Sequence, residues 1–124
     1  MNAREYYLEI QATVHTAPHV VQSSVQFDEI DVNECYIRGV LSLVGNLELH
    51  IAEYVVTTPH VRRLKYRYHL QTAEGKLISR WDNVPHHPQI PTFPDHRHDE
   101  AGGVHASPSV GLADVLVATL HLTE

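Results

Sequence analysis

The chain has 124 residues, of which 43% are hydrophobic, so it can form one domain with a buried core and is too short for two. Its formal net charge of −6 at pH 7 argues against a protein that holds nucleic acid mainly by overall electrostatic attraction, but it leaves room for a local basic patch. No apolar run approaches the roughly 20 residues of a membrane-spanning helix, so we exclude a membrane protein. We therefore expect a single domain over residues 1–124.

The first 30 residues predict a helix followed by a strand. Asn2 can cap a helix, Glu5 stands where a capping box needs an acid, and apolar residues then recur at helical spacing, so we expect a helix over residues 3–15. Pro18 ends it. Alternating apolar and polar residues predict a strand over residues 20–30.

Residues 36–56 predict a β-hairpin around Gly45-Asn46. A two-residue loop with glycine first suits a type II′ turn, which would set Val44 opposite Leu47 and Arg38 opposite Glu53. Unlike charges on facing positions form ordinary cross-strand pairs, so a salt bridge is the first interpretation of Glu53. An active-site carboxylate is the alternative.

A second hairpin is predicted from residues 62–71 and 76–82, around the turn 72–75. Alternation with period two places its apolar residues on one face: Leu64, Tyr66, Tyr68, Leu70, Leu77, Ser79 and Trp81. The other face is polar and carries Lys65, Arg67, His69, Arg80 and Asp82. Seven of the chain's nine lysines and arginines lie between positions 62 and 97, so this face predicts a local basic patch.

The polar face leads into a segment, residues 80–98, that is dense in titratable groups. It holds His86, His87, His96 and His98, and prolines at every third position from Pro85 to Pro94, which exclude a helix. Residues 99–110 predict a flexible connector, and an apolar stripe predicts a final helix from Leu112. We expect an α+β fold: an antiparallel β-meander of about five strands with an N-terminal and a C-terminal helix packed on one face.

Residues 81–88 (WDNVPHHP) and 92–98 (TFPDHRH) resemble the signature of the TumE-type toxin family of toxin–antitoxin systems. The resemblance extends over roughly the C-terminal two thirds, from Glu53-Tyr54 to residues 112–116. It implies a cytoplasmic toxin that is neutralised by a cognate antitoxin protein and is suspected of cutting RNA. The single Cys35, which has no internal disulfide partner, also favours a cytoplasmic location.

The first of three functional hypotheses is a metal-independent ribonuclease. Attack by the RNA 2′-hydroxyl needs a general base, a general acid and cations at the phosphate, and none of these requires a metal or other cofactor. The candidate catalytic residues are His86, His87, His96, His98, Arg80, Asp82 and Glu53. The candidate RNA-binding residues are Arg67, Lys65, Trp81, Asn83 and Arg97.

Two alternatives stay open. The same histidines, His86, His87, His96 and His98, could instead hold zinc or another divalent metal, since imidazole and carboxylate ligands suit such ions. The chain could also be a non-catalytic module that binds a protein. A homo-oligomer is compatible with each of the three hypotheses.

Overall fold

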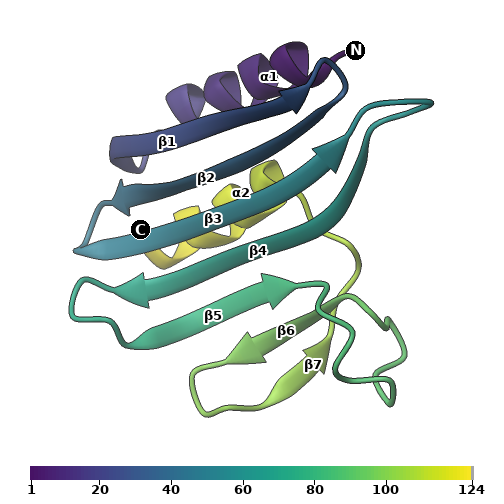
Figure 1. The fold of residues 1–124 in the computed structure, drawn as a ribbon. Helices are drawn as coiled ribbons and strands as arrows, with labels where there is room; N and C mark the ends of the chain where they lie inside the picture. Colours follow the sequence, from purple (N-terminus) through teal and green to yellow (C-terminus); the bar gives the residue numbers. More distant parts are fainter. Residues whose placement is uncertain (124) are drawn as a thin grey trace.

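The computed structural model describes residues 1–123 and has an α+β fold, with two helices on one face of an antiparallel sheet (Figure 1). The elements are α1 (Ala3–Thr16), β1 (Val20–Asp31), β2 (Glu34–Leu43), β3 (Leu47–Val56), β4 (Arg62–Thr72), β5 (Leu77–Asp82), β6 (His96–Asp99), β7 (Val104–Ala106) and α2 (Leu112–Thr123). Each strand pairs with the next along the chain, so the sheet is a simple meander. The α+β class and both helices are therefore confirmed.

Helix α1 begins with the predicted capping box. The Asn2 side chain accepts a hydrogen bond from the Glu5 amide, and the Glu5 carboxylate accepts one from the Asn2 amide. The buried face of α1 consists of Ala3, Tyr6, Ile10 and Val14. Burial of a large apolar side chain contributes about 1.5–3 kcal/mol, so this face fixes α1 on the sheet.

The sheet has seven strands, so the expectation of about five was wrong. The two additional strands, β6 and β7, fall in segments predicted as loop and flexible connector. The sequence His96–Asp99 has no apolar alternation, and it becomes a strand because it pairs with the free edge of β5. Asp99 then stabilises the tight β6–β7 turn by accepting hydrogen bonds from the amides of Ala101 and Gly103.

The predicted register of the first hairpin was wrong by one residue. Leu43, not Val44, pairs with Leu47, and the loop contains three residues, of which Gly45 and Asn46 have φ of 87° and 59°. This shift changes the partner of Glu53, which pairs with Ile37 on the core side of the sheet. Arg38 pairs with Ala52 on the outer side, so the predicted Arg38–Glu53 pair does not form.

The two faces of the second hairpin were predicted correctly except at Leu64, which lies at an irregularity in the pairing of β3 with β4 and lines a cleft on the other side of the sheet. Tyr68 pairs with Trp81 and His69 with Arg80, which is two residues from the expected register and therefore preserves the faces. Tyr66, Tyr68, Leu70, Ser79 and Trp81 are buried, whereas Leu64 is 45% exposed. The helices lie on this core side of the sheet (Figure 1). Lys65, Arg67, His69, Arg80 and Asp82 alternate with the core residues, so their side chains lie on the opposite side, which we call the outer face.

The helices of the described part of the chain fall short of the length and apolarity needed to cross a membrane.

Candidate functional site

Three histidines and an aspartate meet on the outer face at the end of β5. We call His87, His96, His98 and Asp82 the histidine cluster. Pairing of β5 with β6 sets His96 opposite Asp82 and His98 opposite Arg80, so their side chains share one face. His87 reaches the same place from the β5–β6 loop, and its ring centroid lies 4.9 Å from that of His96 and 5.6 Å from that of His98. His96 and Asp82 are each 2% exposed, so these two residues form the buried part of the cluster.

The hydrogen bonds of His96 fix its tautomer. Its Nδ1 lies 2.9 Å from the carbonyl oxygen of Pro94, which can only accept, so Nδ1 carries a proton and donates. The opposite nitrogen, Nε2, lies 3.0 Å from His98 Nε2 and 3.1 Å from Asp82 Oδ1. The ring of His96 is therefore aimed at the middle of the cluster.

The Asp82 carboxylate lies at the centre of the polar contacts. Its Oδ1 accepts a hydrogen bond of 2.9 Å from the Val84 amide, and its Oδ2 lies 3.3 Å from Arg80 Nε and 3.5 Å from His98 Nε2. These contacts from two strands and the loop hold the carboxylate in one orientation. A fixed carboxylate beside imidazoles can orient a base, stabilise an imidazolium or bind a cation.

The surroundings of His98 favour its uncharged form. Burial is the largest cause that lowers its pKa, and the neighbouring His96, Arg80 and His87 lower it further, while the Asp82 carboxylate acts in the opposite direction. The net direction is downward, so at neutral pH the ring is predominantly uncharged. An uncharged imidazole offers a lone pair to a proton or a metal ion.

A basic cleft of about 720 Å³ opens beside the histidine cluster on the outer face. Its lining consists of Tyr36, Arg38, Ala52, Glu53, Tyr54, Leu64, Lys65, Tyr66, Arg67, Arg80, Asn83, Val84, Pro85 and Pro94, so the cleft has four cations and one acid, Glu53, which is 1% exposed. Tyr36 and Tyr54 stack with ring centroids 5.2 Å apart, and the Arg38 guanidinium lies 5.2 Å from the centroid of Tyr36. Arg80 belongs to the cleft and also contacts Asp82, so the cleft and the cluster form one continuous site.

The structure separates the predicted site residues into two groups. His86 is exposed on the loop and stands outside the histidine cluster. Trp81 is buried in the core, and Arg97 lies on the same core-side face, with its Nη1 3.5 Å from Ser79 Oγ. The Asn83 side chain fastens the start of the loop to β4, because it accepts from the Tyr66 amide and donates to the Leu64 carbonyl. These four residues thus stand apart from the cluster's chemistry.

Glu53 lies on the core side of the sheet, away from the histidine cluster. It is 1% exposed and accepts hydrogen bonds from the hydroxyls of Tyr6 and Tyr68, the latter at 2.6 Å. Arg63 donates in turn to the Tyr68 hydroxyl, at 3.1 Å. Burial, followed by the Glu53 carboxylate, raises the pKa of both tyrosines, so their hydroxyls keep the protons that they donate. This network stabilises the core.

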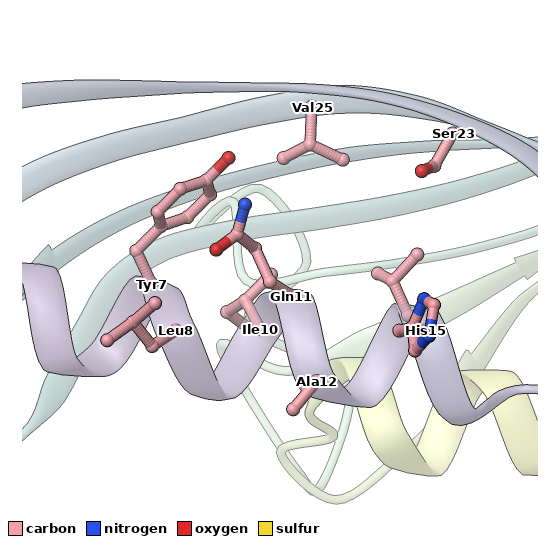
Figure 2. Close-up of a pocket in the computed structure, with 9 residues that line it drawn as sticks. Tyr7, Leu8, Ile10, Gln11, Ala12, His15, Ser23 and Val25 are labelled. Atoms are coloured by element: carbon pink, nitrogen blue, oxygen red, sulfur yellow. The ribbon is translucent and has the colours of Figure 1, made fainter.

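A second groove, of about 540 Å³, lies between α1 and β1. Figure 2 shows Tyr7 and Gln11 directed from α1 toward Val25 on β1. The residues that line it include one histidine, His15, and no acid. The groove therefore offers no group of convergent titratable side chains comparable to the histidine cluster.

Tyr36, Tyr54 and Arg38 were not predicted as site residues. Both tyrosines occupy outward positions of strands that were predicted, so an aromatic pair could have been found from the alternation of side chains. The predicted register set Tyr36 opposite Val55, whereas Tyr36 pairs directly with Tyr54, and the aromatic pair was missed for this reason.

Comparison with models of protein families matched the family described as Toxin TumE over residues 10–123. Comparisons with curated proteins and with solved structures gave no match. The family match confirms the resemblance of the C-terminal two thirds and extends it into α1. Because the matched segment covers nearly all of its length, the chain belongs to the TumE toxin family.

Proposed function

We propose that this protein is the RNA-cleaving toxin of a toxin–antitoxin pair and that cleavage takes place at the histidine cluster. Membership of the TumE family makes it a toxin and implies an antitoxin partner. The observation that carries the proposal of RNA cleavage is the continuity of two features: the histidine cluster opens onto the basic cleft through Arg80. Cleavage of a phosphodiester requires a base, an acid that protonates the leaving oxygen, and cations at the phosphate, and the imidazoles of the cluster are the candidate base and acid.

The cluster supplies the groups that activate a nucleophile. His98, neutral at pH 7, has a lone pair that either accepts the proton of an attacking hydroxyl or ligates a metal ion that activates the nucleophile. Arg80, held near Asp82, faces the negative charge that develops on the phosphate in the transition state. Arg67 stands opposite Asp82 in the β4–β5 register and lines the cleft. It adds a second cation beside the same phosphate.

The basic cleft fits single-stranded RNA. The tyrosine pair, Tyr36 and Tyr54, presents aromatic faces on which bases stack, and stacking contributes about 1–3 kcal/mol per base. Arg38, Lys65 and Arg67 place positive charge along the same surface. Since the whole chain carries a net charge of −6, RNA binding must depend on this local charge.

Replacing Arg67 with glutamine should weaken RNA binding in a salt-dependent way. Each phosphate contact to single-stranded nucleic acid contributes about 0.7 to the slope of log affinity against log salt concentration, so the slope should become shallower by about that amount. The measurement is fluorescence anisotropy with a 2′-O-methyl RNA oligonucleotide, which resists cleavage, at several salt concentrations. Arg4→Gln is the matched control, because Arg4 is exposed on α1 and pairs with Glu29. Equal slopes for both variants would remove Arg67 from the RNA-binding surface.

The proposed function is tested by incubating the purified protein with an end-labelled RNA oligonucleotide and with DNA of the same sequence. We expect fragments from the RNA, intact DNA, and no fragments from either with a folded Asp82→Ala variant. Binding of RNA without cleavage, by a protein that still arrests growth, would instead support the non-catalytic binding module.

A further inference from the structure

We propose that the histidine cluster is a binding site for a divalent transition metal ion, with zinc as the best fit. The ligands would be His96 Nε2, His98 Nε2 and Asp82 Oδ1, with His87 as a further ligand from the loop. The role of the ion in cleavage rests on the function proposed above, whereas its binding does not. Cleavage without metal was the first hypothesis from the sequence, and the geometry of the cluster favours the alternative in which the histidines hold a metal ion.

The distances between donor atoms match a tetrahedral site. Zinc bonds of about 2.0–2.1 Å set tetrahedral nitrogen or oxygen ligands roughly 3.3 Å apart. His96 Nε2 lies 3.0 Å from His98 Nε2 and 3.1 Å from Asp82 Oδ1, and His98 Nε2 lies 3.5 Å from Asp82 Oδ2. The two separations from His96 Nε2 fall within a few tenths of an ångström of this spacing. The third joins His98 to the other oxygen of the same carboxylate, so Asp82 lies within reach of both imidazoles. The donor nitrogens of His87, His96 and His98 lie within 4.8 Å of one another, so the three histidines by themselves come close enough to share an ion.

The surrounding hydrogen bonds orient the ligands toward the ion. Metal-binding histidines usually donate their other ring nitrogen to a carbonyl or carboxylate, and His96 Nδ1 donates to the Pro94 carbonyl. The Val84 amide holds Asp82 Oδ1, while Arg80 Nε lies against Oδ2 and leaves the Oδ1 side to the cluster. Ligands and supporting contacts are thus both formed by the β5–β6 pair and its loop.

Two potential metal ligands lie close to one atom of the cluster. His96 Nε2 faces both a carboxylate oxygen and a second imidazole nitrogen. A divalent ion at the centre would accept the lone pairs of all three donors at once.

The cluster is distinct from the other histidine contacts in residues 1–123. His105 pairs with Asp99 alone, at 2.6 Å, and His50 and His69 have ring centroids 6.3 Å apart. Within this described part of the chain, the three-histidine group is the one set whose donors come close enough to share an ion. Specific binding should therefore saturate at one ion per chain.

The test is equilibrium dialysis of chelator-stripped protein against zinc, with metal analysis of the retained protein. We expect one zinc per chain in the wild type. His98→Ala and Asp82→Asn should each weaken binding by at least the roughly 10–100-fold that loss of an outer-shell partner costs. His15→Ala and His105→Ala, which remove histidines outside the cluster, should bind as the wild type does. Cobalt in place of zinc should give the visible absorption of a tetrahedral site in the wild type and not in His98→Ala.

Two results would overturn the metal site: no zinc retained by folded wild-type protein, or equal retention by His98→Ala. Failure of the metal site is separable from failure of the nuclease. Zinc bound with no RNA cleaved would keep the metal site and remove the nuclease, while cleavage that continues in EDTA would keep the nuclease and remove the ion's role in cleavage.

Discussion

Replacing His96 with alanine should lower the rate of RNA cleavage by about 10²–10⁴-fold, the usual cost of losing an acid–base group. His96 is 2% exposed and points at Asp82 and His98, so its loss removes a proton-transfer group or a metal ligand at the centre of the cluster. The rate would be measured with a labelled RNA oligonucleotide under single-turnover conditions. Because His96 is buried, thermal melting must first show that the variant folds.

His86→Ala is the matched control for this experiment. His86 lies on the same loop as His87 but is exposed and outside the histidine cluster, so its replacement should leave the cleavage rate within about twofold of the wild type. His98→Ala, at a less buried position, provides a second test if His96→Ala fails to fold. Full activity in both folded cluster variants would remove the cluster from the mechanism.

Replacing Glu53 with alanine should destabilise the fold by about 2–6 kcal/mol, because two buried hydroxyls would each lose their acceptor at a cost of about 1–3 kcal/mol. The free energy of unfolding would be measured by urea denaturation. Glu48→Ala is the control on the same strand: Glu48 pairs with the partly exposed His50, so its loss should cost less than about 1 kcal/mol. A cost for Glu53→Ala as small as that for Glu48→Ala would show that the buried network contributes little.

The same residue distinguishes a structural from a catalytic carboxylate. Glu53→Gln keeps the side-chain volume and one acceptor oxygen, so it should remain folded. Since Glu53 lies on the core side of the sheet, the cleavage rate per folded Glu53→Gln molecule should equal that of the wild type. A 100-fold loss of rate in folded protein would return Glu53 to the active site.

The parts of the fold that were predictable from sequence depend on local signals. The capping box at Asn2 and Glu5 specifies the start of α1 within four residues of chain. The two faces of the β4–β5 hairpin were predictable because an error of two residues in register leaves each side chain on its own face. Strand β6 was not predictable, since its polar sequence pairs only because the edge of β5 is free.

His96 and His98 share one face because a spacing of two residues in a strand sets side chains on the same side. Since this segment was predicted as a loop, their shared face was not predicted. The sequence gives no reason to prefer His87 over His86, because the β5–β6 loop alone decides which of them turns inward. Arg67 and Arg80 were predicted as cleft residues from the alternation of side chains along the second hairpin. The one-residue error at Gly45-Asn46 concealed the tyrosine pair and gave Glu53 the wrong partner, Arg38 in place of Ile37.

We propose that this toxin acts by cutting RNA at the histidine cluster. The integrity of RNA in cells that express the protein tests this proposal most directly. Wild type and His98→Ala would be induced to equal levels of folded protein without the antitoxin, and total RNA would be sequenced from its newly formed ends. We predict that new ends accumulate with the wild type as growth stops, and that His98→Ala neither produces these ends nor stops growth. Growth arrest by the wild type with intact RNA, or the same new ends in cells expressing His98→Ala, would contradict the account.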